Sequence, residues 1–344
     1  MPQTAHRTDV VIIGAGPVGL FAIFELGMLR IRCHVVDALD FVGGQCAALY
    51  PEKPIYDIPG FPMIEGRDLI DNLERQAAPF EPVYHLGQQV TGLTRRDDGG
   101  WRVETATGTR IDARAVVVAG GVGAFGPKRP PLAGIETFEG KSVFYMVGRR
   151  EDFRDKRVVI AGGGDSAVDW ALSLVEVAAR VGVVHRRAKF RAAPENEAKL
   201  HRLAAEDRID MVVPFQLDGL EGADGRLDAV IVKSLEGETR RLEADALLPF
   251  FGMAVKLGPI ADWGLDMDRK HLVVDPARCE SNLPGVFVIG DMATYPGKLK
   301  LILTGFAEAA TAAHAIHPLV HPDRALHFEY STTKGLPGAD AGSG

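Results

Sequence analysis

The chain has 344 residues, 46% hydrophobic and 25% charged, which is typical of a globular protein long enough for two domains. A net charge of −7 argues against generic binding to nucleic acid or anionic membranes, and no apolar run approaches the ~18 residues of a membrane span. Cys33, Cys46 and Cys279 are widely spaced, which excludes a disulfide scaffold and a Cys-x-x-Cys redox or zinc site. We predict no metal site and, because the N-terminus lacks a signal-peptide pattern, a cytoplasmic location.

The first predicted unit begins with a short β-branched strand at residues 9–13. The glycine-rich stretch Gly14–Gly19 follows at once, and a helix is predicted from Leu20 to about Leu29. A second strand, from Ile31 to Val36, ends at Asp37. This order of strand, G-x-G-x-x-G turn, helix and acid-terminated strand is the context that a dinucleotide-binding turn requires.

Each position in this turn has a physical role. Gly14 permits the tight turn, Gly16 lets the backbone approach a pyrophosphate, and Gly19 lets the helix pack closely on the strand. Amide groups at the helix N-terminus then face phosphate oxygens, and Pro17 is assigned to the same site. The Asp37 carboxylate lies 23 residues after Gly14, where it can accept hydrogen bonds from a ribose.

A second glycine-rich turn occurs in the middle of the chain. It lies between a predicted strand at 157–161 and a predicted helix at 168–180, and another strand follows at 181–184. His185 occupies the position that corresponds to Asp37, with two arginines behind it. Guanidinium groups bind a 2′-phosphate, which an acid would repel, so this unit is predicted to bind NADP(H) and the first unit an unphosphorylated ribose. The residues assigned to NADP(H) are Gly162, Gly164, Asp165, Ser166, Ala167, His185, Arg186 and Arg187.

Strands and one long helix account for most of the remaining pattern. A hairpin is predicted around the turn at 97–100, and an apolar strand runs up to Asp291. The further predicted strands are 90–93, 101–105, 115–119, 227–234, 240–246, 247–252 and 285–291; the helix is 301–316, and the tail from Gly335 is predicted to be disordered.

The order of these motifs resembles that of flavoproteins with two dinucleotide-binding domains. In that family the first turn holds FAD, and a late strand ending like Gly290-Asp291 returns to the flavin. The resemblance implies an α/β fold of two Rossmann-like three-layer domains, with the NADP domain inserted into the FAD domain. The implied boundaries are 1–120 and 252–334 for the FAD domain and 121–251 for the NADP domain.

Two stretches, 163–167 and 185–191, are similar to thioredoxin reductase, but the place of its Cys-x-x-Cys falls at 145–148, which holds no cysteine. A closer resemblance is to the thioredoxin-reductase-like ferredoxin–NADP⁺ reductases of bacteria. The stretches that carry it are 43–62, 290–302 and 327–333, and it extends over roughly residues 8–334.

This resemblance implies particular contacts with the flavin. Tyr50 stacks on one face of the ring, and Tyr330, with Ser331 beside it, covers the other face as a mobile gate. The alternative interpretations are a core side chain for Tyr50 and a packing anchor for Tyr330. The other implied contacts to FAD are Asp37, Gly44, Gln45, Val90, Phe125, Asp291 and Thr332; Arg191 joins the NADPH site.

The implied activity is electron transfer between NADPH and ferredoxin or flavodoxin in a homodimer, through hydride transfer to flavin N5 and one-electron steps. An NADPH-dependent diaphorase, or a quinone or flavin reductase without a protein partner, is the main alternative; a non-catalytic nucleotide-sensing protein is another. Cys46 is interpreted as a small buried hydrophobic residue and Cys33 as strand core. A basic patch for ferredoxin, or else a solvated face, is predicted at Arg149, Arg150, Arg154, Lys156 and Arg157.

Overall fold

The computed structural model describes residues 5–121 and 123–324, without the side chains of 124–127 and 253–256. The chain forms two compact units: unit 1 is Met1–Phe125 with Val255–Gly344, and unit 2 is Gly126–Ala254. Unit 2 is therefore inserted into unit 1. The two connections between the units include β11 (Ala124–Pro127) and β19 (Met253–Lys256), which pair with each other.

Unit 1 contains helices and strands from both ends of the chain. Its helices are α1 (Pro17–Met28), α2 (Gly44–Ala48), α3 (Gly66–Ala77) and α6 (Ile302–Val320), with the 3₁₀ turn η5 (Gly290–Met292). Its strands are β1 (His6–Arg7), β2 (Val10–Ile13), β3 (Cys33–Val36), β4 (Pro54–Ile55), β5 (Ile64–Glu65), β6 (Val83–His85), β7 (Val90–Arg95), β8 (Trp101–Thr105), β9 (Arg110–Ala113), β10 (Ala115–Val118), β20 (Met267–Asp268), β21 (His271–Val273), β22 (Val286–Val288) and β23 (Ala293–Thr294).

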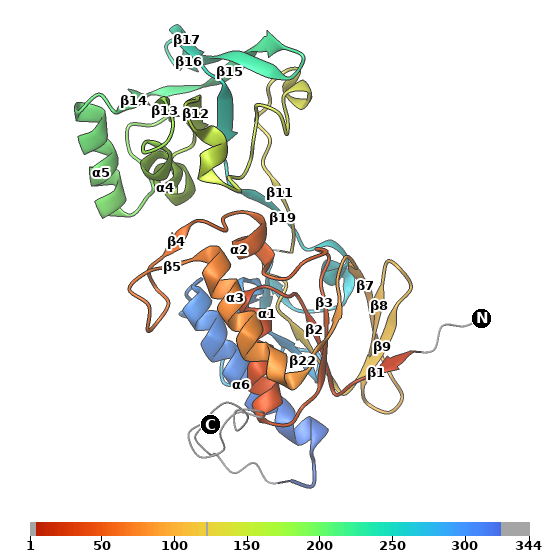
Figure 1. Cartoon of the computed structure of the whole chain (residues 1–344). Coiled ribbons are helices and arrows are strands. Elements are labelled where there is room, and N and C mark those ends of the chain that lie inside the picture. Colours follow the sequence, from red (N-terminus) through yellow and green to blue (C-terminus); the bar gives the residue numbers. More distant parts are fainter. Residues whose placement is uncertain (1–4, 122, 325–344) are drawn as a thin grey trace. The chain divides into compact units, whose positions relative to one another are not determined.

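The centre of unit 1 is a parallel sheet in the order β22-β10-β2-β3-β6. Successive side chains of a strand point to opposite faces, and β2 buries both. Val10 and Ile12 pack in the cluster formed with α1, α3 and α6, whereas Val11 and Ile13 pack with the antiparallel sheet β1-β9-β8-β7. Figure 1 shows the helices on one face of the parallel sheet and the antiparallel strands on the other. Unit 1 is thus a three-layer α/β structure.

Unit 2 repeats this plan on a smaller scale. Its elements are β12 (Arg157–Ala161), α4 (Asp165–Leu174), β13 (Arg180–Val184), α5 (Pro194–Ala205), β14 (Ile209–Val212), β15 (Phe215–Ala223), β16 (Arg226–Ser234), β17 (Thr239–Glu243) and β18 (Ala246–Pro249). The parallel sheet has the order β14-β13-β12-β18, with α4 and α5 against it and the antiparallel sheet β15-β16-β17 on its other face. Val159 and Val184 pack there against Leu227 and Val230.

Some predicted boundaries are wrong, for local or tertiary reasons. Helix α1 begins at Pro17 rather than Leu20, because proline is well suited to a first helical turn. Helix α4 ends at Leu174, well before the predicted end at residue 180. Residue 180 instead opens β13, where it pairs with Arg157 of β12, so sheet pairing overrides the helix propensity of the intervening residues. The predicted strand 240–246 is divided between β17 and β18, which belong to different sheets.

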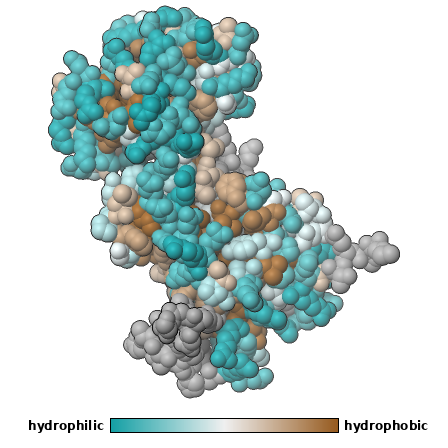
Figure 2. Space-filling view, in the orientation of Figure 1, coloured by the Kyte–Doolittle hydropathy of each residue, from teal (hydrophilic) through white to brown (hydrophobic). Residues whose placement is uncertain are grey.

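The described surface visible in Figure 2 is largely hydrophilic, as expected for a chain with 25% charged residues. Within the described ranges, 5–121 and 123–324, no helix is long and apolar enough to cross a membrane. In Figure 2, hydrophilic residues predominate on the visible face of unit 2, and unit 1 shows separate apolar patches.

Three histidines form a cluster in unit 1: His34 and His85 on the paired strands β3 and β6, and His6 on β1 of the antiparallel sheet. The Nδ1 atom of His34 lies 3.0 Å from Nε2 of His85, and the His6 ring centre lies 5.1 Å from that of His85. Burial, with smaller effects from His85, His6 and Arg32, lowers the pKa of His34 to about 4. Burial also lowers the pKa of His85. Protonation of His34 and His85 therefore opposes folding.

We predict that the free energy of unfolding decreases as the pH falls from about 6.5 towards 4. Because the pKa of His34 is lower in the folded chain, the unfolded chain binds more protons in this range. His34→Gln should remove roughly 1 kcal/mol of this loss, a figure reduced to allow for solvent screening. Urea unfolding at a series of pH values measures it. The control is His201→Gln, at an exposed position on α5, which should show the wild-type dependence of the unfolding free energy on pH. The same pH dependence in the wild type, His34→Gln and His201→Gln would contradict the prediction.

Candidate functional site

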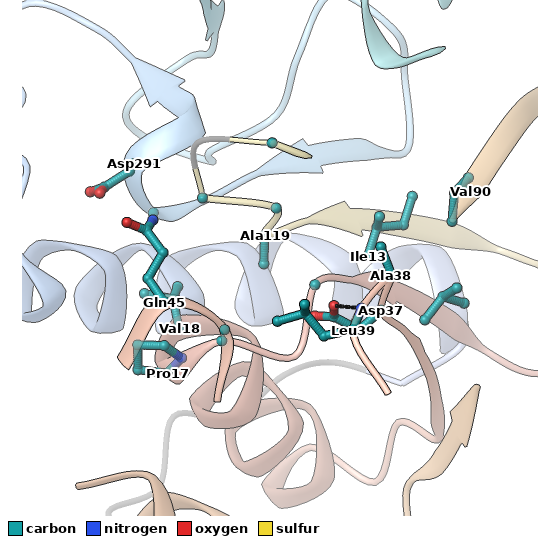
Figure 3. Close-up of a pocket in the computed structure, with 18 of the residues that line it drawn as sticks. Ile13, Pro17, Val18, Asp37, Ala38, Leu39, Gln45, Val90, Ala119 and Asp291 are labelled. Carbon is teal, nitrogen blue, oxygen red and sulfur yellow. Dashed lines mark hydrogen bonds between the residues drawn. The ribbon is translucent and has the colours of Figure 1, made fainter. Parts of the chain in front are cut away.

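Unit 1 contains a pocket of about 340 Å³ at the carboxyl ends of its parallel strands. Figure 3 shows Gln45 and Asp291 near one end of it and Val90 near the other, with Asp37 between α1 and the Val90 end. The predicted residues that line the pocket are Gly14, Gly16, Pro17, Asp37, Gly44, Gln45, Tyr50, Val90 and Asp291. The structure therefore brings together residues separated by more than two hundred positions in the sequence.

The turn between β2 and α1 is built for close backbone approach. Gly14 has φ +112°, which L-residues with a side chain rarely adopt, and a Cβ there would overlap the carbonyl oxygen of Ala119. A Cβ on Gly19 would overlap the carbonyl oxygen of Gly14, so Gly19 acts in packing and does not line the pocket. Gly16 is the N-cap of α1 and no side chain caps this helix. Backbone amide groups are thus available beside the pocket, as an anionic pyrophosphate requires.

Asp37 is fixed by two backbone donors. Its Oδ2 accepts the N–H of Ala15 at 2.6 Å, and its Oδ1 accepts the N–H of Leu39 at 2.8 Å. Burial raises the pKa of this carboxyl group, and the backbone N–H groups act in the opposite direction. Each carboxylate oxygen has further acceptor capacity, so the group can also receive the hydroxyls of a ribose.

At the other end of the pocket, Tyr50 follows α2 and packs partly against the helix-side core. Tyr50 is partly buried and also lines the pocket, and its stacking on a flavin ring stays a prediction. Its hydroxyl is hydrogen-bonded to the thiol of Cys46, which is 1% exposed. Burial raises the pKa of Cys46 to about 11, so the thiol stays protonated near neutral pH. The interpretation of Cys46 as a small buried residue is confirmed, as is that of Cys33.

Other residues of this pocket carry no sequence motif. Gln88 and Gln89 lie between β6 and β7, while Leu257, Pro259 and Ile260 follow β19. Gln88 also donates its backbone N–H to the carbonyl oxygen of Asp37 at 2.8 Å. Leu301 and Ile302, at the start of α6, line the pocket with Gly290. The residues between β6 and β7 and those after β19 reach the pocket through the tertiary arrangement, which the sequence pattern does not reveal. Gly290, Leu301 and Ile302 belong to the stretch 290–302 that carries the family resemblance.

Unit 2 holds the second glycine-rich turn, between β12 and α4. A Cβ on Gly163 would overlap the ring of His185, which follows directly after β13. His185 is 9% exposed, and its Nε2 has no hydrogen-bond partner among the residues that the structure describes. Burial, and more weakly the charges of neighbouring arginines, lower its pKa. The imidazole is thus a buried group packed against the turn, and its role beside a nucleotide stays a prediction.

Three arginines lie next to this turn. The backbone N–H of Arg191 donates to the carbonyl oxygen of Gly163 at 2.6 Å, which ties the 186–191 segment to the turn. Asp165, the first residue of α4, accepts the N–H of Ala193 at 2.9 Å and secures the same segment. Arg186, Arg187 and Arg191 are exposed and form no salt bridge with the described part of the chain. The turn, His185 and the arginines therefore form one site within unit 2.

The predicted basic patch of unit 2 is partly neutralised. Arg157 binds Glu243 at 2.6 Å and Asp245 at 2.8 Å, and Arg154 binds Glu151. For these two residues the structure favours the alternative of a solvated face.

Several predicted residues lie outside the described part of the chain. They are Tyr330, Ser331 and Thr332, the tail from Gly335, and the side chain of Phe125.

Comparisons with known proteins agree with this architecture. A curated relative from Paramagnetospirillum magneticum is 63% identical over 96% of this chain and 98% of its own length, and is named ferredoxin–NADP reductase. A relative from Granulibacter bethesdensis with the same name is 65% identical over 96% of this chain and 95% of its own length. A crystal structure of Lactococcus lactis thioredoxin reductase matches with a TM-score of 0.78 at 24% identity, covering 92% of this chain and 99% of that one.

The likeness to thioredoxin reductase concerns the fold alone, and it confirms the predicted class of two Rossmann-like domains. The family model described as pyridine nucleotide-disulphide oxidoreductase matches residues 8–315. This protein belongs to the pyridine nucleotide-disulphide oxidoreductase family.

Proposed function

We propose that this protein is a FAD-dependent oxidoreductase that transfers electrons between NADPH and ferredoxin. The observation that carries the proposal is the contrast between its two glycine-rich turns. The turn of unit 1 is followed by the partly buried carboxylate of Asp37, and that of unit 2 by His185 and exposed arginines. Relatives that are 60–65% identical over nearly the whole chain bear the name ferredoxin–NADP reductase, which supports the choice of partner.

The pocket of unit 1 fits FAD at each of its parts. Asp37 and Val90 would hold the adenosine, and the amides at the start of α1 would hold the pyrophosphate. Gln45 and Asp291 would contact the ribitol, and Tyr50 would stack on the flavin ring. The close packing of the glycine-rich turn supports this assignment independently, because a Cβ on Gly14 would overlap the carbonyl oxygen of Ala119.

The site of unit 2 fits NADPH. Arg186 and Arg187 would bind the 2′-phosphate, while the amides at the start of α4 would bind the pyrophosphate. The ring of His185, packed beside Gly163, would border the adenosine. Each residue here binds or orients the nucleotide, and none is needed as a general acid or base.

Bound FAD would supply the chemistry, since a flavin accepts a hydride and can release electrons one at a time. The three cysteines are all buried and free, which disfavours a dithiol relay within this chain. We extend the proposal to a cytoplasmic homodimer, to flavodoxin as a second partner, and to Tyr330 as a mobile cover of the flavin; these points rest on the family resemblance.

The proposed function is tested with the purified holoenzyme and a ferredoxin from the same source. In stopped-flow measurements, the enzyme reduced by NADPH should transfer electrons to ferredoxin at a higher rate than to a quinone or ferricyanide at the same concentration. If ferredoxin is reduced no faster than ferricyanide or the quinone, the result favours a diaphorase. A colourless protein without flavin absorbance or NADPH oxidation would favour a nucleotide sensor.

The double variant Arg186→Ala with Arg187→Ala should raise the KM for NADPH about 10–100-fold, because two charge-assisted contacts to the 2′-phosphate are lost. The KM for NADH, which lacks this phosphate, should change by less than about threefold. Steady-state kinetics with a dye acceptor measure both. Arg226→Ala, in the antiparallel sheet of the same unit, is the control. Equal effects on the two nucleotides would refute the assignment.

Asp37→Asn should raise the dissociation constant for FAD about tenfold or more, because the ribose loses a charged acceptor. Titration of the apoprotein with FAD, followed by flavin fluorescence, measures the change. Asp40→Asn alters an exposed carboxylate three residues further along and should leave binding unchanged. Unaltered affinity in the Asp37 variant would remove this residue from the FAD site.

A further inference from the structure

A buried ion pair lies behind the end of the pocket that holds Asp291. Glu308 on α6 and the side chain of Lys298 are each 4% exposed, and the two form a salt bridge. The Oε1 of Glu308 also accepts the hydroxyl of Tyr295 at 2.6 Å. Burying two charges costs several kcal/mol per ion before their attraction offsets it, so such a pair is weak evidence for a role in stability alone.

The other oxygen of Glu308 reaches the pocket wall. Its Oε2 accepts the backbone N–H of Gly290 at 2.7 Å, and this contact is fully buried. Gly290 and Asp291 both line the pocket, and Gly290 has φ +73°. A buried N–H without an acceptor is unfavourable by about 1–3 kcal/mol, so Glu308 favours the backbone conformation from which Asp291 projects.

The packing of α6 brings Glu308 to this position. Gly305, one turn before Glu308, has no space for a side chain, because a Cβ there would overlap Val18 of α1 and lie 3.4 Å from the Cα of Gly290. The helix therefore lies directly against the turn that it supports. Burial raises the pKa of the neighbouring thiol of Cys279 to about 12, and the charge of Glu308 contributes to this increase.

We propose that Glu308 is a positioning residue for the flavin end of the pocket. Its carboxylate, paired with Lys298, holds the N–H of Gly290 and thereby places Asp291 for the cofactor. The inference rests on the proposed function, in that the pocket is taken to bind FAD. The proposal concerns the hydrogen bond from the N–H of Gly290 to Glu308. Two double variants can separate the effect of this hydrogen bond from that of the ion pair with Lys298.

The test compares two double variants that both remove the buried charges. Lys298→Met with Glu308→Met leaves the N–H of Gly290 without an acceptor. Lys298→Met with Glu308→Gln keeps a side-chain carbonyl oxygen in its place. Replacing a buried ion pair by residues of similar volume is often neutral for folding, so both apoproteins should be folded in the absence of urea. The Met–Met apoprotein should unfold at a somewhat lower urea concentration, because the N–H of Gly290 has lost its acceptor.

Titration of each apoprotein with FAD should show a dissociation constant raised about tenfold or more for the Met–Met protein. It should stay within about threefold of wild type for the Met–Gln protein. The visible circular dichroism of the bound flavin should change only in the Met–Met protein. Wild-type affinity in both proteins, or an equal loss in both, would overturn the role of the Gly290 contact.

If the Met–Met protein does not fold, a further variant tests the same hydrogen bond. Glu308→Asp keeps the charge beside Lys298 but shortens the side chain by one methylene, and it should lose FAD affinity to a similar degree; unchanged affinity counts against the proposal. A wild-type apoprotein that binds no FAD overturns the proposed function itself, and that result is distinct from any difference between variants.

Discussion

A strand that passes directly into a helix, packed so closely that a side chain has no space at particular glycines, is the constraint on which both units depend. In unit 1 the carbonyl oxygens of Gly14 and Ala119 occupy the positions that side chains on Gly19 and Gly14 would need. In unit 2 the ring of His185 occupies the space beside Gly163. No side chain caps the N-terminus of α1 or of α4, and an uncapped helix N-terminus is a ready site for a phosphate group.

The two sites differ in the side chains that come directly after β3 in unit 1 and directly after β13 in unit 2. Asp37 is partly buried and its carboxylate is held by two backbone N–H groups, so its orientation is set before any ligand arrives. The arginines of unit 2 are exposed, and only the backbone of their segment is tied to the turn, through Arg191 and Asp165. A buried acceptor suits a neutral ribose, whereas exposed guanidinium groups can adapt to a doubly charged phosphate. The same local fold therefore supports two different nucleotide preferences.

The sequence was informative where the physics is local. Both glycine turns, the strands beside them, and the positions of Asp37 and His185 follow from patterns shorter than thirty residues, and the structure has them as predicted. The predicted end of the helix after Ser166 is wrong because the pairing of Arg180 with Arg157 cannot be read from helix propensity. Gln88 and Leu257 reach the pocket by strand order alone, and Glu308 meets Gly290 only because α6 packs on α1. Such contacts depend on tertiary structure and leave no local signal.

The cysteines constrain the route of electrons within the chain. Cys33, Cys46 and Cys279 are buried, and burial raises their pKa values to about 12, 11 and 12. Disulfide exchange requires an accessible thiolate, which none of the three provides. With FAD in the pocket of unit 1, electrons would leave from the flavin itself, without a thiol intermediate.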